Sequence, residues 1–498
     1  MDEPITRIVV LGAGSAGLMT ALALHRAFPT IKLTVVHCPD EPIIGVGEST
    51  TVAFPQFVHQ SLGILPAEFF PTVRPSWKLG IRFIWGDPTV PYFDYPFDSA
   101  MSNKPPASAK MPAYFCLESG RSESRCASLM DQQLSPCFVA QDGQIVVNDA
   151  FGYHVENEPL VNLLWNKINA TPIEVVEGRV VDAPRQGNGA IIALRLNDDR
   201  HVAGDLFVDA SGFRSRLLRE ELQVPFVSYA SSLYCDTAVI GSWRREAPIL
   251  PYTTAETMSA GWCWQIEFPD HVTRGYVFSS AFITREAAEQ EFRARNPAFE
   301  SDVRFVPFDS GRSSEFWTQN VVAIGNAAGF TEPLEATALH LVIEQIRLLC
   351  RVVSEGNLRT LPGLRAAANH RFRLLWDEVR DFLSIHFRFN RHLDTPFWQH
   401  CQRSVDLGGA AGLVELFQEA GPSTLCTTSL PSGHVFGYDG FMSLLVGQRV
   451  PTRFRNDLSA HDRERWDQYR QALREQTRHA LPMRVAIDQL CGPGRRPG

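Results

Sequence analysis

The sequence lacks the patterns that mark several common protein classes. It has no Lys- or Arg-rich run, and 47 basic against 55 acidic side chains give a net charge of −8, which argues against a nucleic-acid partner. Neither a P-loop nor a G-x-S-x-G elbow occurs, so nucleoside triphosphatases and serine hydrolases lack their motifs. With 498 residues, 44% of them hydrophobic, the chain can bury a large core, which excludes an intrinsically disordered protein.

Cysteine pairs and long apolar runs are also missing. The ten cysteines form no C-x-x-C pair and no spacing typical of zinc ligands, so we expect free thiols, no metal and a cytoplasmic protein. The most apolar stretch, residues 8–24, contains three glycines and follows two acidic residues rather than a basic segment. We therefore expect neither a signal peptide nor a membrane span.

The first forty residues carry the pattern of a dinucleotide-binding βαβ unit. Residues 8–11 and 32–37 are short β-branched runs, and residues 16–28 between them have apolar side chains at helical spacing. The first turn reads GAGSAG and matches the G-x-G-x-x-G fingerprint, which leaves a helix N-terminus facing the phosphates of a dinucleotide. His37 replaces the carboxylate that usually ends the second strand.

The rest of the chain predicts an α/β fold. Two more strand-like runs lead into glycine-rich segments, at residues 205–212 and 321–329. Three such junctions spread over about three hundred residues favour a Rossmann-type module that binds FAD, and we place it at residues 1–350. Residues 226–305 have strand-like runs without βαβ rhythm, which predicts an antiparallel second sheet inserted in this module. Residues 351–498 predict a mainly helical substrate-side region. Because no second G-x-G-x-x-G motif occurs, the chain has no separate nicotinamide domain, and the electrons for a bound flavin would come from elsewhere. A single-component hydroxylase that binds NADPH transiently stays open as the alternative.

Two tryptophans, Trp262 and Trp264, stand two residues apart in one strand-like run. Side chains at this spacing share a face of a strand, so the two indoles would form one bulky wall. A tryptophan pair is also common in ordinary buried sheet surface, because tryptophan is highly buried on average. The residues alone leave both interpretations open.

Five motifs, in chain order, resemble those of the flavin-dependent halogenases, of which the tryptophan halogenases are the best known. They are GAGSAG at residues 12–17, GVGEST at 45–50, WKLG at 77–80, WCWQI at 262–266 and GNAAGFTEPLEAT at 325–337. The resemblance implies a two-component enzyme. FADH2 from a separate NAD(P)H-dependent flavin reductase, O2, and chloride or bromide would give hypohalous acid, which halogenates an electron-rich aromatic such as indole.

The resemblance assigns the reactive groups to Lys78 and Glu335. Lys78 would hold or capture hypohalous acid, and apolar neighbours would favour its neutral form. Glu335 would polarise the electrophile and accept the proton that the ring loses. On the residues alone, Lys78 also fits a strand lysine whose head group reaches water. Glu335 also fits a carboxylate that complements a helix dipole, because Pro333 predicts the first turn of a helix.

The same resemblance implies the binding residues. The expected contacts of FAD are Gly12, Ala13, Gly14, Ser15, Ala16, Gly17, Glu48, Ser49, Val180, Asn326 and Leu339. Halide would bind at Thr337 and Ala338, where the free N–H groups of a helix start attract an anion.

The substrate side is expected to be aromatic. By resemblance, Trp262 and Trp264 would separate the substrate from the flavin, and Tyr95 and Phe97 would stack against its ring. Residues 433–445 are compact and glycine-rich, and they resemble no lid for the amino acid part of tryptophan. We therefore expect free indole or another small aromatic as the substrate.

Two departures from the family's pattern bear on halide preference. Ala336 and Ala338 give E-A-T-A where E-S-T-G is usual, and Glu267 replaces a proline. These changes leave halide preference open, bromide included. The sequence also leaves open a homodimer and two other functions, a flavin-dependent hydroxylase or oxidoreductase and a non-catalytic flavin-binding protein.

Overall fold

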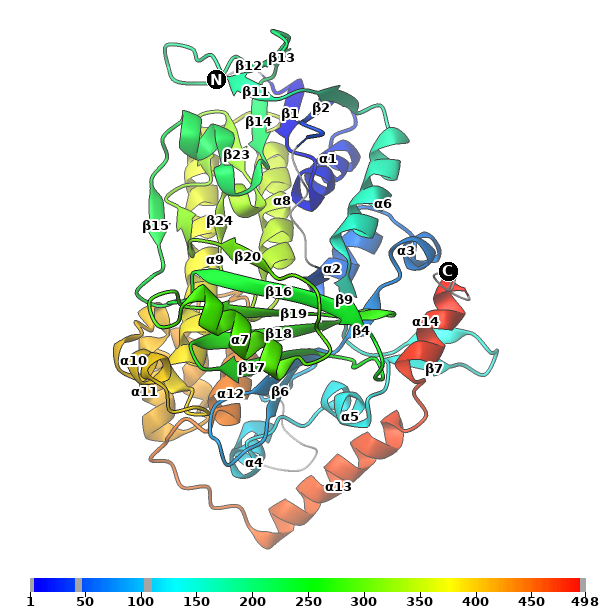
Figure 1. Ribbon diagram of the computed structural model, residues 1–498, viewed down its shortest axis with the longest axis vertical. Coiled ribbons are helices and arrows are strands. Elements are labelled where there is room, and N and C mark those ends of the chain that lie inside the picture. Colours follow the sequence, from blue (N-terminus) through cyan, green and yellow to red (C-terminus); the bar gives the residue numbers. More distant parts are fainter. Residues whose placement is uncertain (1–3, 41–46, 103–109, 493–498) are drawn as a thin grey trace. The chain divides into compact units, whose positions relative to one another are not determined.

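A computed structural model describes residues 4–40, 47–102 and 110–492 (Figure 1). Gly45 and Val46 of the GVGEST motif lie outside the described residues. The chain divides into two compact units, each built from three separate segments. Unit 1 comprises Met1–Val73, Val155–Ser228 and Asp309–Trp376, and unit 2 comprises Arg74–His154, Tyr229–Phe308 and Asp377–Gly498. The sequence predicts a domain boundary between residues 350 and 351. Units 1 and 2 are not these predicted domains, so the boundary stays a prediction.

Unit 1 is built on a six-stranded sheet in the order β10-β2-β1-β14-β23-β22. The strands are β1 (Arg7–Leu11), β2 (Lys32–His37), β10 (Glu174–Glu177), β14 (Leu206–Asp209), β22 (Trp317–Thr318) and β23 (Val321–Ala323). All pairings are parallel except that of β22 with β23. The predicted Rossmann-type sheet is therefore confirmed.

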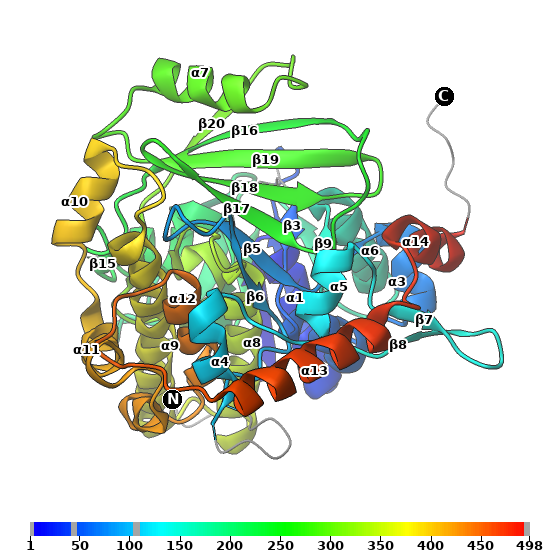
Figure 2. The ribbon, with the colours of Figure 1, turned by 90° about the horizontal axis from the view of Figure 1, so that it is seen from below.

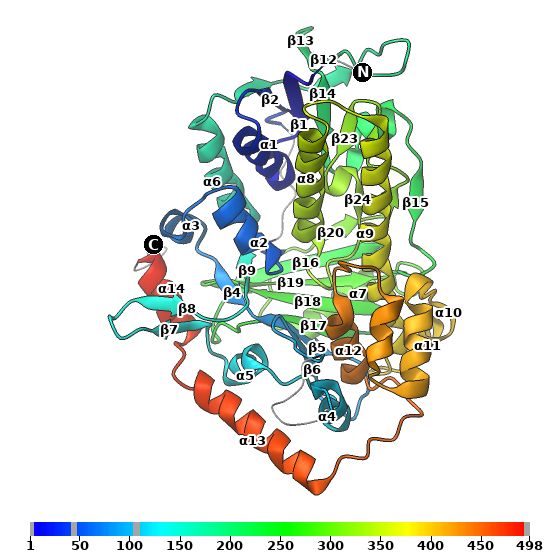
Figure 3. The same cartoon turned by 180° about the vertical axis from the view of Figure 1, so that it is seen from behind.

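Three helices accompany this sheet, namely α1 (Ser15–Ala27), α6 (Asn157–Asn169) and α8 (Ala338–Glu355). Helix α1 packs against α6 and α8, and both lie beside it in Figures 1 and 3. Its apolar residues are buried, including Leu18, Leu22 and Leu24. Burial of this face holds the glycine-rich turn that precedes α1 against the sheet.

The three strand-to-glycine junctions end neighbouring strands, β1, β14 and β23. The Ala210 N–H donates to the Leu11 carbonyl at 2.8 Å, and the Ile324 N–H donates to the Asp209 carbonyl at 2.9 Å. Because parallel strands point the same way, the junctions meet at one edge of the sheet.

Unit 2 contains a seven-stranded sheet in the order β20-β16-β19-β18-β17-β5-β6. Its strands are β5 (Gly80–Ile84), β6 (Phe93–Pro96), β16 (Thr237–Arg244), β17 (Thr253–Met258), β18 (Gly261–Glu267), β19 (His271–Phe278) and β20 (Arg304–Pro307). Only β5 and β17 pair in parallel. The predicted antiparallel sheet is present, and Figure 2 shows helix α7 (Arg285–Arg295) covering it beside β16 and β20.

The C-terminal part is helical, as predicted. Its helices are α9 (Pro362–Phe389), α10 (Pro396–Ser404), α11 (Ala411–Ala420), α12 (Gly437–Gly447), α13 (Ala460–Thr477) and α14 (Met483–Cys491). Helix α13 begins at a capping box formed by Ser459 and Asp462. Among the described residues, no helix combines the length and apolar character needed to cross a membrane.

Smaller elements complete the two units. Those of unit 1 are β3 (Glu48–Ser49), α2 (Ala53–Gln56), α3 (Pro66–Val73), β11 (Val180–Asp182), β12 (Ala193–Leu196), β13 (His201–Ala203), β15 (Phe226–Ser228), β21 (Gly311–Ser313) and β24 (Gly329–Phe330). Those of unit 2 are β4 (Ser76–Lys78), α4 (Pro112–Ser119), α5 (Arg125–Gln132), β7 (Cys137–Val139) and β8 (Ile145–Val147). Strand β9 (Gly152–Val155) begins in unit 2 and ends at the first residue of the next unit 1 segment.

Candidate active site

A cavity of about 400 Å³ lies in unit 1, where β1, β14 and β23 end. Its lining includes most of the residues predicted to bind FAD, together with one predicted halide residue. These are Gly12, Ala13, Gly14, Ser15, Ala16, Glu48, Val180, Asn326, Ala338 and Leu339. The two other predicted FAD contacts, Gly17 and Ser49, are next to this lining in the chain. The fold thus gathers residues from five separate elements around one hollow.

The glycine turn fits a pyrophosphate. Gly12 has a φ of +110°, and a Cβ there would lie 2.3 Å from the Ala210 carbonyl oxygen. A Cβ on Gly17 would lie 2.0 Å from the Gly12 carbonyl oxygen, whereas a Cβ on Gly14 would meet no atom within 4 Å. Gly12 and Gly17 are therefore required by the protein's own backbone. Gly14 lines the cavity without a Cβ and leaves its face open to a ligand.

Burial shifts the pKa of two titratable side chains on the cavity wall, His37 and Glu48. Burial lowers the pKa of His37, while Glu177, 3.9 Å from the imidazole, raises it. The His37 ring lies 5.0 Å from the ring of Trp165, which also lines the cavity. Burial raises the pKa of Glu48 to about 7, which favours the protonated carboxyl more than its ordinary pKa does. Both side chains can therefore offer neutral hydrogen-bonding groups to a bound nucleotide.

Sequence reasoning missed part of this wall. Trp165 and the guanidinium-bearing residues Arg179, Arg214 and Arg216 also line the cavity. None of them belongs to a glycine-rich motif, and an arginine or tryptophan in a helix or loop carries no local signal for nucleotide binding. The fold alone brings them to the cavity.

The predicted helix start at Pro333 is wrong. Helix α8 begins at Ala338, and residues 333–336 form a turn in which the Ala336 N–H donates to the Pro333 carbonyl at 3.0 Å. Ala336 has a φ of +57°, a left-handed conformation that interrupts helical hydrogen bonding. Glu335, 4% exposed, therefore sits on a tight turn ahead of the helix and not in its first turn. This position weakens the interpretation of Glu335 as a helix-dipole partner.

The predicted halide residues lie at the start of α8. Ala338 is its first residue, and Thr337 precedes it without capping the helix through its side chain. The Thr337 hydroxyl is buried and has no hydrogen-bond partner among the described residues. Free backbone N–H groups and an unused hydroxyl at a helix start suit an anion.

Lys78 lies in unit 2, on β4, with 0% of the residue exposed. Its ammonium is buried as well, so the alternative of a strand lysine with its head group in water is wrong. The Nζ atom lies 5.1 Å from the centroid of the Phe97 ring. The structure therefore brings the predicted catalytic lysine together with one predicted substrate-stacking residue.

Trp262 and Trp264 lie on one face of β18 and are 1% and 5% exposed. The indole of Trp264 lies over Gly275 of β19, where a Cβ would come within 2.4 Å of the ring. Cys263, on the opposite face, packs into a core with Tyr276 and other apolar residues. The predicted shared face is present, and a barrier role for the pair stays a prediction.

Tyr95 belongs to an aromatic cluster that sequence reasoning did not find. Its ring centroid lies 6.1 Å from that of Phe382 on α9. Phe382 in turn stacks on Phe436 at 3.7 Å and meets Phe441 edge-on at 5.1 Å. Phe436 and Phe441 belong to residues 433–445, which the sequence describes only as compact and glycine-rich. The sequence did not indicate the cluster, because these aromatic side chains come together only when the segment packs on α9.

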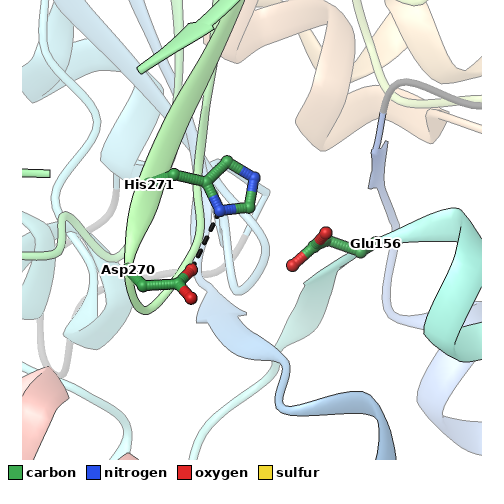
Figure 4. Close-up of side chains that lie close together, drawn as sticks. All are labelled: Glu156, Asp270 and His271. Atoms are coloured by element: carbon green, nitrogen blue, oxygen red, sulfur yellow. Dashed lines mark hydrogen bonds and ion pairs between the residues drawn. The ribbon is translucent and has the colours of Figure 1, made fainter. Parts of the chain in front are cut away.

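A hydrogen-bonded pair, Asp270 and His271, lies at the turn between β18 and β19 (Figure 4). His271 Nδ1 lies 2.9 Å from Asp270 Oδ1, and the Asp270 side chain is largely exposed. Glu156, also drawn there, belongs to unit 1. Two ligand atoms are fewer than a metal centre needs, so we assign no metal to this pair.

The chain resembles known proteins over nearly its whole length. The tryptophan halogenase family model matches residues 7–463. Tryptophan 7-halogenase KtzQ from Kutzneria sp. (strain 744) is 30% identical over 467 residues, which cover 88% of this chain and 86% of KtzQ. Tryptophan 6-halogenase ThaL from Streptomyces albogriseolus is 29% identical over 431 residues, which cover 80% of this chain and 79% of ThaL.

Solved structures agree with this relationship. The crystal structure of MibH, described as "a lathipeptide tryptophan 5-halogenase", is 36% identical with a TM-score of 0.89 and covers 99% of this chain and 95% of MibH. The tryptophan 6-halogenase SttH from Streptomyces toxytricini is 27% identical with a TM-score of 0.87, covering 97% of this chain and 99% of SttH. The motifs, the fold and these matches agree, and the chain therefore belongs to the tryptophan halogenase family and is a flavin-dependent halogenase.

Proposed function

We propose that this enzyme transfers bromine or chlorine to the ring of an indole, using FADH2 from a separate flavin reductase. Members of the family use FADH2, halide and O2 and act on aromatic substrates together with such a reductase. The observation that carries the proposal is the buried ammonium of Lys78, 5.1 Å from the Phe97 ring. Burying a lysine is costly, and such costs concentrate at functional sites.

Each predicted residue has a chemical task in this proposal. Bound FADH2 supplies the electrons that reduce O2. The open face of Gly14 and the N-terminus of α1 hold the pyrophosphate, and Thr337 with the first N–H groups of α8 holds the halide. Lys78 donates a hydrogen bond that orients hypohalous acid, and Glu335 accepts the proton that the ring releases.

The substrate is proposed to be a flat, electron-rich ring. The Tyr95, Phe382 and Phe436 cluster supports this class, because aromatic faces favour stacking with other rings by about 0.5–1.5 kcal/mol. Free indole or a similar small aromatic is our first candidate. A tryptophan side chain within a peptide is the second, and it is favoured by the 36% identity to MibH over 99% of the chain.

The test combines the purified chain with photochemically reduced FAD, O2 and equal concentrations of bromide and chloride. Parallel reactions contain indole, tryptophan and a tryptophan-containing peptide, and mass spectrometry detects the halogen isotope patterns. We expect halogenated indole, with no product when halide is omitted. A product from the peptide alone would select the second candidate. Hydroxylated product, or no product from any indole, would contradict the proposal.

Replacing Gly14 with alanine is expected to weaken FAD binding about tenfold at an unchanged melting temperature. The new Cβ would enter open space in the protein but occupy the place where the pyrophosphate approaches. Fluorescence titration and thermal unfolding measure the two quantities. Gly12→Ala is the matched variant, because its Cβ would collide with the Ala210 carbonyl and should lower the melting temperature. Wild-type FAD affinity in Gly14→Ala would contradict the assigned role of the turn.

A further inference from the structure

A fully buried imidazole, that of His154, lies on the strand that pairs with the lysine strand. In the antiparallel pair β4 and β9, Ser76 stands opposite His154, and Lys78 stands opposite Gly152. Opposite residues, and residues two apart, share a face of a sheet. The side chains of His154, Ser76 and Lys78 therefore lie on one face, and Gly152 leaves space opposite the lysine.

The hydrogen bonds around His154 fit a neutral imidazole protonated at Nδ1. The Ser76 hydroxyl donates to the Glu267 carbonyl at 2.5 Å, so its single proton is already used. Ser76 Oγ must then accept from His154 Nδ1, which lies 3.2 Å away. On the other side of the ring, His154 Nε2 lies 2.8 Å from Thr253 Oγ1. A neutral ring protonated at Nδ1 would accept the threonine proton at Nε2. A neutral imidazole protonated at Nδ1 satisfies all of these contacts.

The charges near His154 also favour a neutral imidazole. Burial lowers the pKa of His154 well below its ordinary value, and the positive charges of Lys78 and Arg245 lower it further, whereas the backbone carbonyl of Glu267 raises it. The Glu267 carboxylate, at the position where the family has a proline, forms a buried ion pair with Arg245. Protonation of His154 would put a second positive charge on the face of the sheet that carries Lys78.

We infer that His154 is a positioning residue for Lys78. Through Thr253 on β17 and Ser76 on β4 it joins two elements, so that the short strand carrying Lys78 cannot shift, and its neutral ring adds no second cation beside the ammonium. The inference rests on the proposed role of Lys78 in halogenation.

The first test does not depend on activity. NMR of the full-length protein labelled with 15N-histidine, with the His154 signal assigned from His154→Gln, reports the protonation of each ring nitrogen. We expect a neutral ring protonated at Nδ1 at the ordinary histidine pKa of about 6.5, and a titration that lies below it. In Lys78→Met the titration of His154 should shift upward, because a positive charge has been removed. An unchanged titration, or a ring protonated at Nε2, would overturn the inference.

The second test measures halogenated product per FADH2 consumed. His154→Phe removes both hydrogen bonds, and we expect the yield to fall about 100-fold with unchanged KM and FAD affinity, since a displaced catalytic group has effects of this size. His154→Gln should restore most of the yield, because an amide both donates and accepts. His392→Gln is the control, a partly buried histidine of unit 2 that faces Glu256 and Arg295.

The outcomes separate the inference from the proposed function. A wild-type yield in His154→Phe, or an equal loss of yield and FAD affinity without rescue by glutamine, would overturn the inference. If His154→Phe does not fold, Thr253→Val removes one bond isosterically and should lower the yield at unchanged FAD affinity. If the wild-type enzyme gives no halogenated product, the proposed function fails, while the titration of His154 in Lys78→Met still decides whether the two residues are coupled.

Discussion

Replacing Lys78 with methionine is expected to lower halogenated product at least about 1,000-fold while FAD still binds. The ammonium is buried against Phe97, so its loss removes the group proposed to orient the oxidant. Methionine fills a similar volume without a charge, so the variant keeps most of the packing against Phe97. Mass spectrometry of the product and fluorescence titration of FAD measure the two effects.

The matched control for this variant is Lys110→Met. Lys110 also belongs to unit 2, donates to the Asp457 carbonyl at 3.0 Å and lies 5.9 Å from the Tyr114 ring. Lys110 is therefore also a lysine beside an aromatic ring, but the ring and the other contacts differ from those of Lys78. We expect it to keep the wild-type product yield. Equal yields from both lysine variants would show that Lys78 has no special role.

The second large effect is expected for Glu335→Gln, which should lower kcat about 100-fold to 1,000-fold with little change in KM. Glutamine keeps the shape of the side chain but cannot accept the ring proton. Removal of that proton should then become slow, so a ring-deuterated substrate should react more slowly in the variant than its protonated form. Steady-state kinetics with both substrates measure the change.

A helix-dipole role for Glu335 predicts a different result. Such a role contributes about 0.3–1 kcal/mol, which corresponds to less than a tenfold change, and it gives no isotope effect. Glu344→Gln is the control, because this carboxylate lies on α8 and pairs with Arg347 at 2.7 Å. We expect its kcat to match that of the wild type. A change below tenfold in Glu335→Gln would assign the carboxylate to stability rather than to catalysis.

Most motif residues of the candidate site could be named from the sequence because their signals are local. The GAGSAG turn, the strand ending at His37 and the tryptophan pair depend on spacings of two to six residues, and the structure has β2 at the predicted residues 32–37. The burial of Lys78 could not be predicted, since a lysine in a strand fits both a buried and an exposed head group. The same limit applies to His154, whose partners Ser76 and Thr253 are about 80 and 100 residues away along the chain.

The sequence by itself determined the Rossmann-type start of the chain and the helical C-terminal part, because backbone preference and hydrophobic period act over a few residues. It also indicated the family, through five motifs that resemble those of the flavin-dependent halogenases. Only the tertiary structure decided that β5 joins β17, that Ala336 adopts a left-handed turn ahead of α8, and that Phe382 meets Phe436. These features depend on which distant surfaces bury one another. Such long-range packing depends on the whole folded chain, so it cannot be predicted from a short segment of the sequence.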